Sequence, residues 1–267
     1  MAQPKRINPE EAVREIREAG ERRSNPVVDL SRINEYKHFF VACARKVCPG
    51  FEIRDELKGT YNDIFHWAIM DYEGNLDPDK GLFLWGDVGT GKSTMLRIIR
   101  EFCHCVRPPV DDRRYYFRID NVIDICAEFA DESPGGGYNA IRCYITCPRQ
   151  AFDELGSETK PTGRWGNFEN VMQYIFQRRY DSRNNQFTHV TSNYTPDQIA
   201  EYYGARIYDR FKEMFNFVAL RGKTFRKSTQ KNFKDETENK TKTKAGSKTK
   251  KKSPAKGKTD KLGEETV

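Results

Sequence analysis

The chain has 267 residues, of which 37% are hydrophobic and 12% aromatic, so it carries enough apolar side chains to build a hydrophobic core. No apolar run approaches the roughly 18–20 residues that a membrane-spanning helix needs, and the first residues contain no apolar signal segment. These features predict an intracellular, cytoplasmic protein that does not associate with a membrane.

The net charge of +7 comes entirely from the end of the chain. Residues 227–267 contain 13 lysines and 6 acidic residues, whereas the preceding residues carry 33 basic and 33 acidic side chains. The lysine-rich segment has almost no apolar side chains, so we expect it to form a disordered tail. The charge therefore does not indicate a basic DNA-binding face on the folded body. The tail itself could bind nucleic-acid phosphates without sequence preference, or bind nothing.

Three helical patterns precede the first predicted strand. A short, highly charged helix is predicted over 8–20, and helices with apolar side chains at helical spacing are predicted over 31–47 and 55–72. We expect residues 1–50 to form a helical N-terminal extension that could bind a partner. The third helix is expected to pack on the main domain.

From Gly81 the sequence alternates between strands and helices, which is typical of a parallel sheet covered by helices on both faces. The predicted elements are strands at 81–85, 115–119 and 187–191, and helices at 93–105, 122–129 and 168–180. Residues 51–226 are therefore expected to form a single α/β domain with three layers.

The segment between the first strand and its following helix matches the phosphate-binding pattern G-x-x-x-x-G-K-[ST], Walker A, at every defined position. Its glycines let backbone N–H groups surround phosphates, Lys92 reaches the β- and γ-phosphates, and Ser93 places its hydroxyl on Mg2+. The sequence thus predicts a P-loop that binds ATP and Mg2+. Nucleotide contacts are expected from Gly86, Asp87, Val88, Gly89, Thr90, Gly91, Lys92, Ser93 and Thr94.

A carboxylate for the metal and a base for water are supplied by adjacent residues. Asp153 is expected to hold Mg2+, and Glu154 to polarise the attacking water. Pro148 and polar neighbours before this pair indicate a short or irregular strand. The competing candidate, Asp120, has no second carboxylate beside it. Asn193, which follows the last predicted strand, is expected to orient water near the γ-phosphate.

Together these motifs resemble the DnaC/IstB-type branch of the AAA+ ATPases, over roughly residues 55–226. This branch contains bacterial helicase loaders and the ATPase subunits of some transposition systems. Besides the P-loop and Phe-Asp-Glu-Leu-Gly, the series comprises Arg178-Arg-Tyr180, Thr191-Ser-Asn193, Gly204-Ala-Arg-Ile-Tyr-Asp-Arg210 and Thr224-Phe-Arg226. The last two blocks are most similar to the helicase-loader version.

The resemblance implies roles for three arginines. Arg210 would be an arginine finger that reaches a neighbouring subunit's nucleotide, so the chain would self-associate through it. Arg226 would be a sensor-2 arginine on the γ-phosphate of its own subunit, and Arg206 would assist. The residues alone also allow Arg206 and Arg210 to be solvated members of one helix. The resemblance further implies a core without a C-terminal lid.

As a helicase loader, the chain would bind a replicative ring helicase and single-stranded DNA under the control of its ATP state. Three alternatives are open. An IstB-like protein would bind a transposase and duplex DNA, and a nucleotide-gated adaptor would hardly hydrolyse ATP. A P-loop small-molecule kinase is disfavoured by the Asp-Glu pair and the late arginines. The seven cysteines form no C-x-x-C pair, so no metal besides Mg2+ is indicated.

Overall fold

The computed structural model describes most of the chain between residues 27 and 225 and a few residues near the N-terminus. The described residues are 8, 10–11, 13–14, 27–107, 115–182, 188–222 and 224–225. All of them belong to the first of two units into which the chain divides, Met1–Arg226 and Lys227–Val267. The helix expected over 8–20 lies mostly outside the described residues, and the lysine-rich tail lies entirely outside them. Within the described ranges, no helix is both long and apolar enough to cross a membrane.

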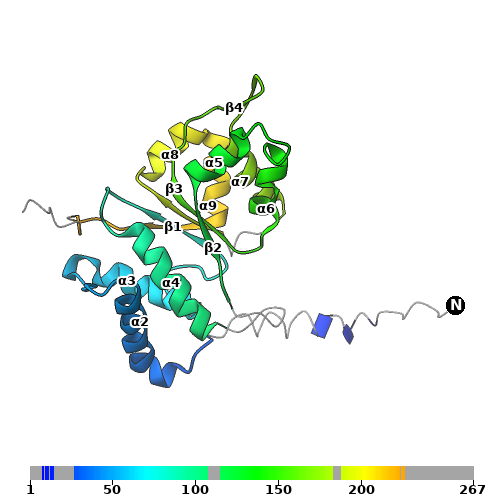
Figure 1. Ribbon diagram of the computed structural model, residues 1–267. Helices are drawn as coiled ribbons and strands as arrows, with labels where there is room; N and C mark the ends of the chain where they lie inside the picture. Colours follow the sequence, from blue (N-terminus) through cyan, green and yellow to red (C-terminus); the bar gives the residue numbers. More distant parts are fainter. Residues whose placement is uncertain are drawn as a thin grey trace, which may run out of the picture. The chain divides into compact units, whose positions relative to one another are not determined.

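Five parallel strands of the described residues form a sheet in the middle of the Met1–Arg226 unit (Figure 1). They are β1 (Gly81–Trp85), β2 (Arg118–Asn121), β3 (Gln150–Leu155), β6 (Thr188–Ser192) and β7 (Phe215–Ala219). Their order is β2-β3-β6-β1-β7. Strand β1 is apolar throughout because helices cover both faces of the sheet: Leu82 and Leu84 join the core on one side, and Phe83 joins the core on the other.

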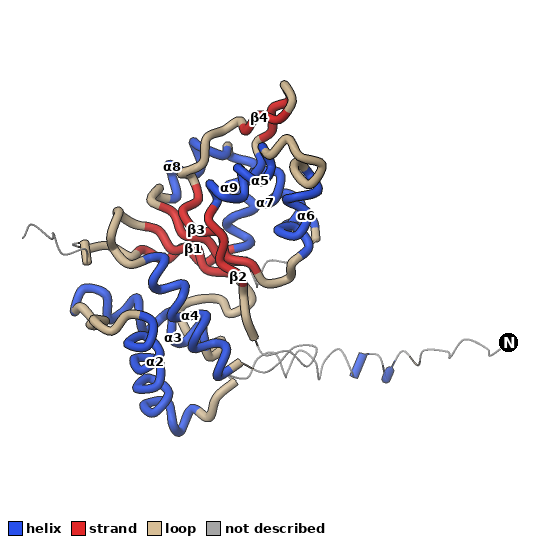
Figure 2. Tube along the Cα trace, in the orientation of Figure 1, coloured by secondary structure: helices blue, strands red, loops and turns tan. Residues whose placement is uncertain are grey.

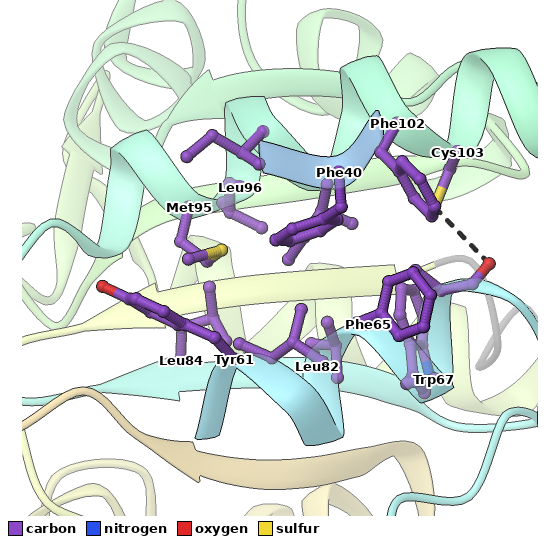
Figure 3. Close-up of a cluster of buried hydrophobic side chains, with 14 of the residues drawn as sticks. Phe40, Tyr61, Phe65, Trp67, Leu82, Leu84, Met95, Leu96, Phe102 and Cys103 are labelled. Atoms are coloured by element: carbon purple, nitrogen blue, oxygen red, sulfur yellow. Dashed lines mark hydrogen bonds between the residues drawn. The ribbon is translucent and has the colours of Figure 1, made fainter. Parts of the chain in front are cut away.

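One face of the sheet is covered by α2 (Ile33–Val47), α3 (Lys58–Ala68) and α4 (Lys92–Val106) (Figure 1). Short 3-10 turns, η1 (Leu30–Arg32) and η2 (Asp55–Leu57), lead into the first two of these helices. The ring of Phe40 on α2 lies 6.0 Å from that of Phe65 on α3 and 5.1 Å from that of Phe102 on α4, measured between centroids (Figure 3). Helix α2 therefore shares its core with the P-loop helix.

The opposite face is covered by a second group of helices (Figure 2). They are α5 (Val122–Ala130), α6 (Tyr138–Thr146), α7 (Val171–Asp181), α8 (Pro196–Tyr203) and α9 (Ala205–Met214). An antiparallel hairpin, β4 (Thr162–Arg164) and β5 (Asn167–Glu169), connects β3 to α7. The ring of Phe176 on α7 packs 5.0 Å from Phe152 on β3 and 4.9 Å from Phe211 on α9, so this core joins the helices to the strand that carries the carboxylates.

The predicted three-layer α/β architecture is confirmed, with local differences. The strand expected over 115–119 begins only at Arg118, although Tyr115 and Phe117 before it are buried. The helix expected over 168–180 begins at Val171, because the hairpin uses the residues before it. Helix α6, helix α8, the hairpin and β7 were not predicted.

Arg179, the middle residue of the Arg178-Arg-Tyr180 motif, connects secondary-structure elements of the fold. Its side chain is fully buried, and its Nη1 donates to the carbonyl oxygens of Tyr144 (2.8 Å) and Cys147 (2.7 Å). Its Nε donates to Thr188 Oγ1 at 3.0 Å. Burial lowers the pKa of Arg179 to about 10. The guanidinium thereby ties the end of α6 to α7 and β6.

Candidate nucleotide-binding site

The P-loop leaves β1 at Gly86 and enters α4 at Lys92. Gly91, the residue before the helix, has a φ of 89°, in the left-handed region that favours glycine. The first N–H groups of α4 and its positive dipole end therefore face the space beyond β1, which is the geometry of an anion site. Thr90 Oγ1 braces the loop by donating to the carbonyl oxygen of Asp87 at 2.9 Å.

A cavity of about 490 Å³ lies beside this loop. The predicted residues that line it are Val88, Gly89, Gly91, Lys92, Ser93, Thr94, Asp153, Glu154 and Asn193. The structure thus brings together the P-loop, the Asp-Glu pair and Asn193, which come from three different segments. Lys92 is largely buried, and its Nζ donates to the carbonyl oxygens of Gly86 (2.7 Å) and Asp87 (2.8 Å). Its charge therefore lies at the base of the loop.

Ser93 and Asp153 meet across the cavity. Ser93 Oγ donates to Asp153 Oδ1 at 2.8 Å, and the buried Thr191 hydroxyl donates to the same carboxylate oxygen. Mg2+ is commonly held by one or two carboxylates together with phosphates, so a hydroxyl beside a mostly buried carboxylate fits this ion. Within the described residues, no three His, Cys, Asp or Glu side chains gather as a metal cluster. Ser93 and Asp153 could hold such an ion together with phosphate oxygens.

Glu154 lies at an irregular point of β3. Its φ is 63°, and the pairing of β3 with β6 shifts register between Phe152 and Leu155. The irregularity expected near Pro148 thus occurs at the carboxylate pair itself. Thr191 Oγ1 accepts from the Glu154 N–H at 2.9 Å, so one threonine touches both members of the pair. A non-glycine residue at positive φ is uncommon, and such residues cluster at functional sites.

Asn121 is a site residue that sequence reasoning missed. It ends β2 and caps α5, where its side-chain oxygen accepts from the Ile123 N–H at 2.9 Å. Its Nδ2 donates to Glu154 Oε2 at 3.0 Å. An asparagine at the junction of a strand and a helix was the available signal. Asp120 beside it is not among the cavity residues, and its carboxylate accepts from Gln150 Nε2 at 2.7 Å.

The segment after β7 crosses the P-loop. The Phe225 N–H donates to the carbonyl oxygen of Gly89 at 2.9 Å, and a Cβ on Gly89 would lie 2.1 Å from Thr224 Oγ1. Phe225 lines the cavity, and the Arg54 guanidinium stacks 3.5 Å from the centroid of its ring. Arg226, the expected sensor-2 residue, lies outside the described residues. Its role is therefore still a prediction.

Arg206 and Arg210, the other two arginines to which the resemblance gives roles, lie on α9 and outside this cavity. Arg206 is exposed. The Arg210 side chain is only 15% exposed: its guanidinium packs 4.7 Å from the Tyr180 ring centroid and lies 4.0 Å from Asp181 Oδ1. Neither arginine lines the nucleotide cavity of its own chain. Arg97 of α4, which was not predicted, does line it and adds a positive charge there.

No known protein-family model and no curated protein sequence matches the chain. Among solved structures, the fold is similar to that of the DnaC helicase loader, with a TM-score of 0.48 and 16% identity over 65% of this chain and 94% of that chain. It is also similar to DnaI, with a TM-score of 0.46 and 20% identity over 68% and 93% of the two chains. AMPPCP-bound DnaA from Aquifex aeolicus gives a TM-score of 0.43 and 15% identity over 63% and 48%.

The fold assignment follows from the chain itself. The phosphate-binding loop joins β1 to α4, and β6 separates β1 from β3, so the carboxyl ends of these strands bring Lys92, Asp153 and Asn193 to one edge of the sheet. The protein has the three-layer α/β fold of the P-loop NTPases.

Proposed function

We propose that the chain binds ATP and Mg2+ in the P-loop cavity, hydrolyses ATP, and acts in DNA replication as a DnaC-like helicase loader. The ATPase part is carried by one observation: Lys92, Ser93, Asp153 and Glu154 converge on a single cavity of about 490 Å³. The loader part is supported by the motif series of the sequence, which ends in the Gly204–Arg210 block and is most similar to helicase loaders.

The P-loop side of the cavity binds the phosphates. Lys92 and the N–H groups at the start of α4 face the β- and γ-phosphates. Ser93 Oγ and Asp153 Oδ1, which are 2.8 Å apart, hold the metal. When bound, Mg2+ neutralises charge on the phosphate oxygens.

The residues on the β3 side of the cavity orient and deprotonate the attacking water. Asn121 occupies Oε2 of Glu154, which leaves Oε1 to accept a hydrogen bond and then a proton from the attacking water. Thr191 fixes the backbone of Glu154 and the carboxylate of Asp153 at once. Asn193, beyond the end of β6, contacts the water or the γ-phosphate from the same edge.

The partner assignments follow from the resemblance. The chain self-associates so that Arg210, with Arg206 beside it on α9, completes the site of a neighbouring subunit. Arg210 lies outside its own cavity and packs against Tyr180, so it is available to another subunit only if this packing opens. The ATP-bound state holds a ring helicase and single-stranded DNA, and hydrolysis releases them.

The ATPase is tested by turnover of the purified full chain. Glu154→Gln should bind ATP as the wild type does and lose turnover by about a hundredfold or more, because it lacks the base. Asp120→Asn is the matched control, because it neutralises the neighbouring carboxylate on β2 that does not line the cavity. Equal turnover of wild type and Glu154→Gln would contradict the proposal.

The loader assignment is tested with the same variant. Glu154→Gln, held in the ATP-bound state in its native cells, is crosslinked and its partners are identified. Co-purification of a hexameric replicative helicase, together with preference for single-stranded over duplex DNA, is the expected result. A transposase, with duplex preference and no helicase, would assign the chain to transposition instead.

A further inference from the structure

The loop that follows Glu154 is held by a set of hydrogen bonds. Because Glu154 has a positive φ at a shift in strand register, no regular strand pairing fixes its direction. The residues that follow Glu154 form the hydrogen bonds of this segment instead. The Glu154 carbonyl oxygen accepts from the Ser157 N–H at 3.0 Å and from Ser157 Oγ at 2.6 Å, and Ser192 Oγ donates to the carbonyl oxygen of Leu155 at 2.6 Å.

Glu158 forms hydrogen bonds to this loop and to α8. The residue is only 6% exposed, its Oε2 accepts from the Gly156 N–H at 2.8 Å, and its Oε1 accepts from the Tyr203 hydroxyl. The Tyr202 hydroxyl donates to the carbonyl oxygen of Glu158 at 2.7 Å. Burial raises the pKa of Glu158, and burial also raises the pKa of Tyr203, before the neighbouring carboxylate adds to it. A buried carboxyl group is costly unless its oxygens are paired, so these contacts are strongly held.

The hydrogen bond between Tyr203 and Glu158 connects the loop after Glu154 to the α8–α9 segment. Tyr203 is the last residue of α8, and Gly204 with a φ of 85° leads directly into α9, which carries Arg206 and Arg210. A cavity of about 360 Å³ is lined by Ser157 and Glu158, so there is space beside the loop into which it could shift. A change at the start of α9 would therefore be passed to the loop through the Tyr203 hydroxyl.

We propose that Tyr203 and Glu158 are positioning residues for Glu154: their hydrogen bond holds the loop 155–158 so that the carboxylate faces the water, and it couples this orientation to the α8–α9 segment. This inference rests on the proposed ATPase function. Neither residue lines the nucleotide cavity, so both act through Gly156 and Ser157.

The test uses Tyr203→Phe in the full chain, which removes one hydroxyl and keeps the ring. We expect kcat to fall by about tenfold or more, because small displacements of a catalytic group are costly. KM and ATP affinity should stay within about twofold, because the phosphate contacts are untouched. Glu158→Gln, whose amide oxygen can accept only one of the two hydrogen bonds, should change kcat in the same direction.

The matched control is Tyr144→Phe. Tyr144 is also a buried tyrosine that donates to a glutamate, Glu128, at 2.9 Å, but Glu128 lies on α5 and not in the loop 155–158. It should have wild-type kcat. An unchanged kcat in both Tyr203→Phe and Glu158→Gln would overturn the proposal. A raised KM at constant kcat, or an equal fall of kcat in Tyr144→Phe, would overturn it too.

Amide hydrogen exchange supplies a readout that does not depend on hydrolysis. The Gly156 N–H should exchange several times faster in Tyr203→Phe than in wild type or Tyr144→Phe, because its acceptor Glu158 loses its own partner. Unchanged exchange at Gly156 would contradict the positioning role. If the wild type hydrolyses no ATP, the proposed function fails, and this exchange result alone decides whether the bond positions the loop.

Discussion

The two sides of the nucleotide cavity are built from the chain in different ways. The proposed phosphate side comes from one continuous segment, the P-loop and the start of α4, whose backbone N–H groups and lysine would bind the phosphates. The carboxylate side is assembled from β2, β3 and β6, which contribute Asn121, the Asp153–Glu154 pair and Thr191. We therefore expect ATP binding to depend on the local geometry of the P-loop. ATP turnover is expected to depend on how distant segments of the chain are held together.

The largest expected effect breaks the phosphate side. Lys92→Ala should weaken ATP binding by about a hundredfold or more, because it removes a mostly buried charge that would bind the phosphates. The measurement is calorimetric titration with ATP and Mg2+. Lys46→Ala, which removes a lysine of α2 that is paired with Glu101 and does not line the cavity, should bind ATP normally. Unimpaired binding by Lys92→Ala would remove the P-loop lysine from the site.

A smaller effect is expected on the carboxylate side. Thr191→Val keeps the shape of the side chain but loses the hydroxyl that contacts Asp153 and the Glu154 N–H. Turnover should fall by about ten- to a hundredfold while ATP affinity changes little, since the P-loop is intact. Steady-state kinetics measure both quantities. Thr146→Val, which removes a hydroxyl bonded to the Arg142 carbonyl oxygen, is the control. If Thr191→Val mainly lost affinity, the division between the two sides would be wrong.

The two sides of the cavity also differ in how much of each could be predicted from the sequence. The P-loop pattern could be recognised in the sequence because it occupies consecutive residues, and its role in binding phosphates is still a prediction. Asp153 and Glu154 were located as an adjacent acidic pair. Asn121 and Thr191 were missed because their contacts depend on the order of the strands, which places β3 between β2 and β6.

The contacts between helices could not be predicted from the sequence either. The sequence pattern placed the helix at residues 31–47 but not its contacts, so it was assigned to an N-terminal extension. Phe40 packs between α3 and α4, which makes this helix part of the core beneath the P-loop. Arg179 gave no sign in the sequence that it would be buried, because its partners are carbonyl oxygens at the end of α6.

The smallest expected effect concerns the sheet beneath both sides. His189 on β6 is fully buried, and its Nδ1 accepts from the Leu82 N–H at 3.2 Å. Burial, followed by the charges of Arg107 and Arg179, lowers the pKa of His189 to about 3 from an ordinary value of 6.5. Between these values the unfolded chain binds the proton and the folded chain does not. The free energy of unfolding should therefore decrease as the pH falls from 6.5, by up to about 1.4 kcal/mol per pH unit.

Urea unfolding of the wild type and of His189→Asn at pH 7 and pH 5 measures this contribution. The asparagine oxygen can replace Nδ1 as the acceptor and does not titrate, so the variant should lose less stability between the two pH values. A parallel decrease in both proteins would mean that His189 takes up its proton in the folded state.

In the proposed function, both sides of the cavity form a single ATP–Mg2+ site, with the metal held between Ser93 and Asp153. The most direct test is the affinity for ATP with Mg2+ and with EDTA, measured for the wild type and for Asp153→Asn. We expect Mg2+ to strengthen ATP binding in the wild type and to have little effect in Asp153→Asn, with similar affinities of the two proteins in EDTA. An equal strengthening by Mg2+ in both proteins would contradict the claim.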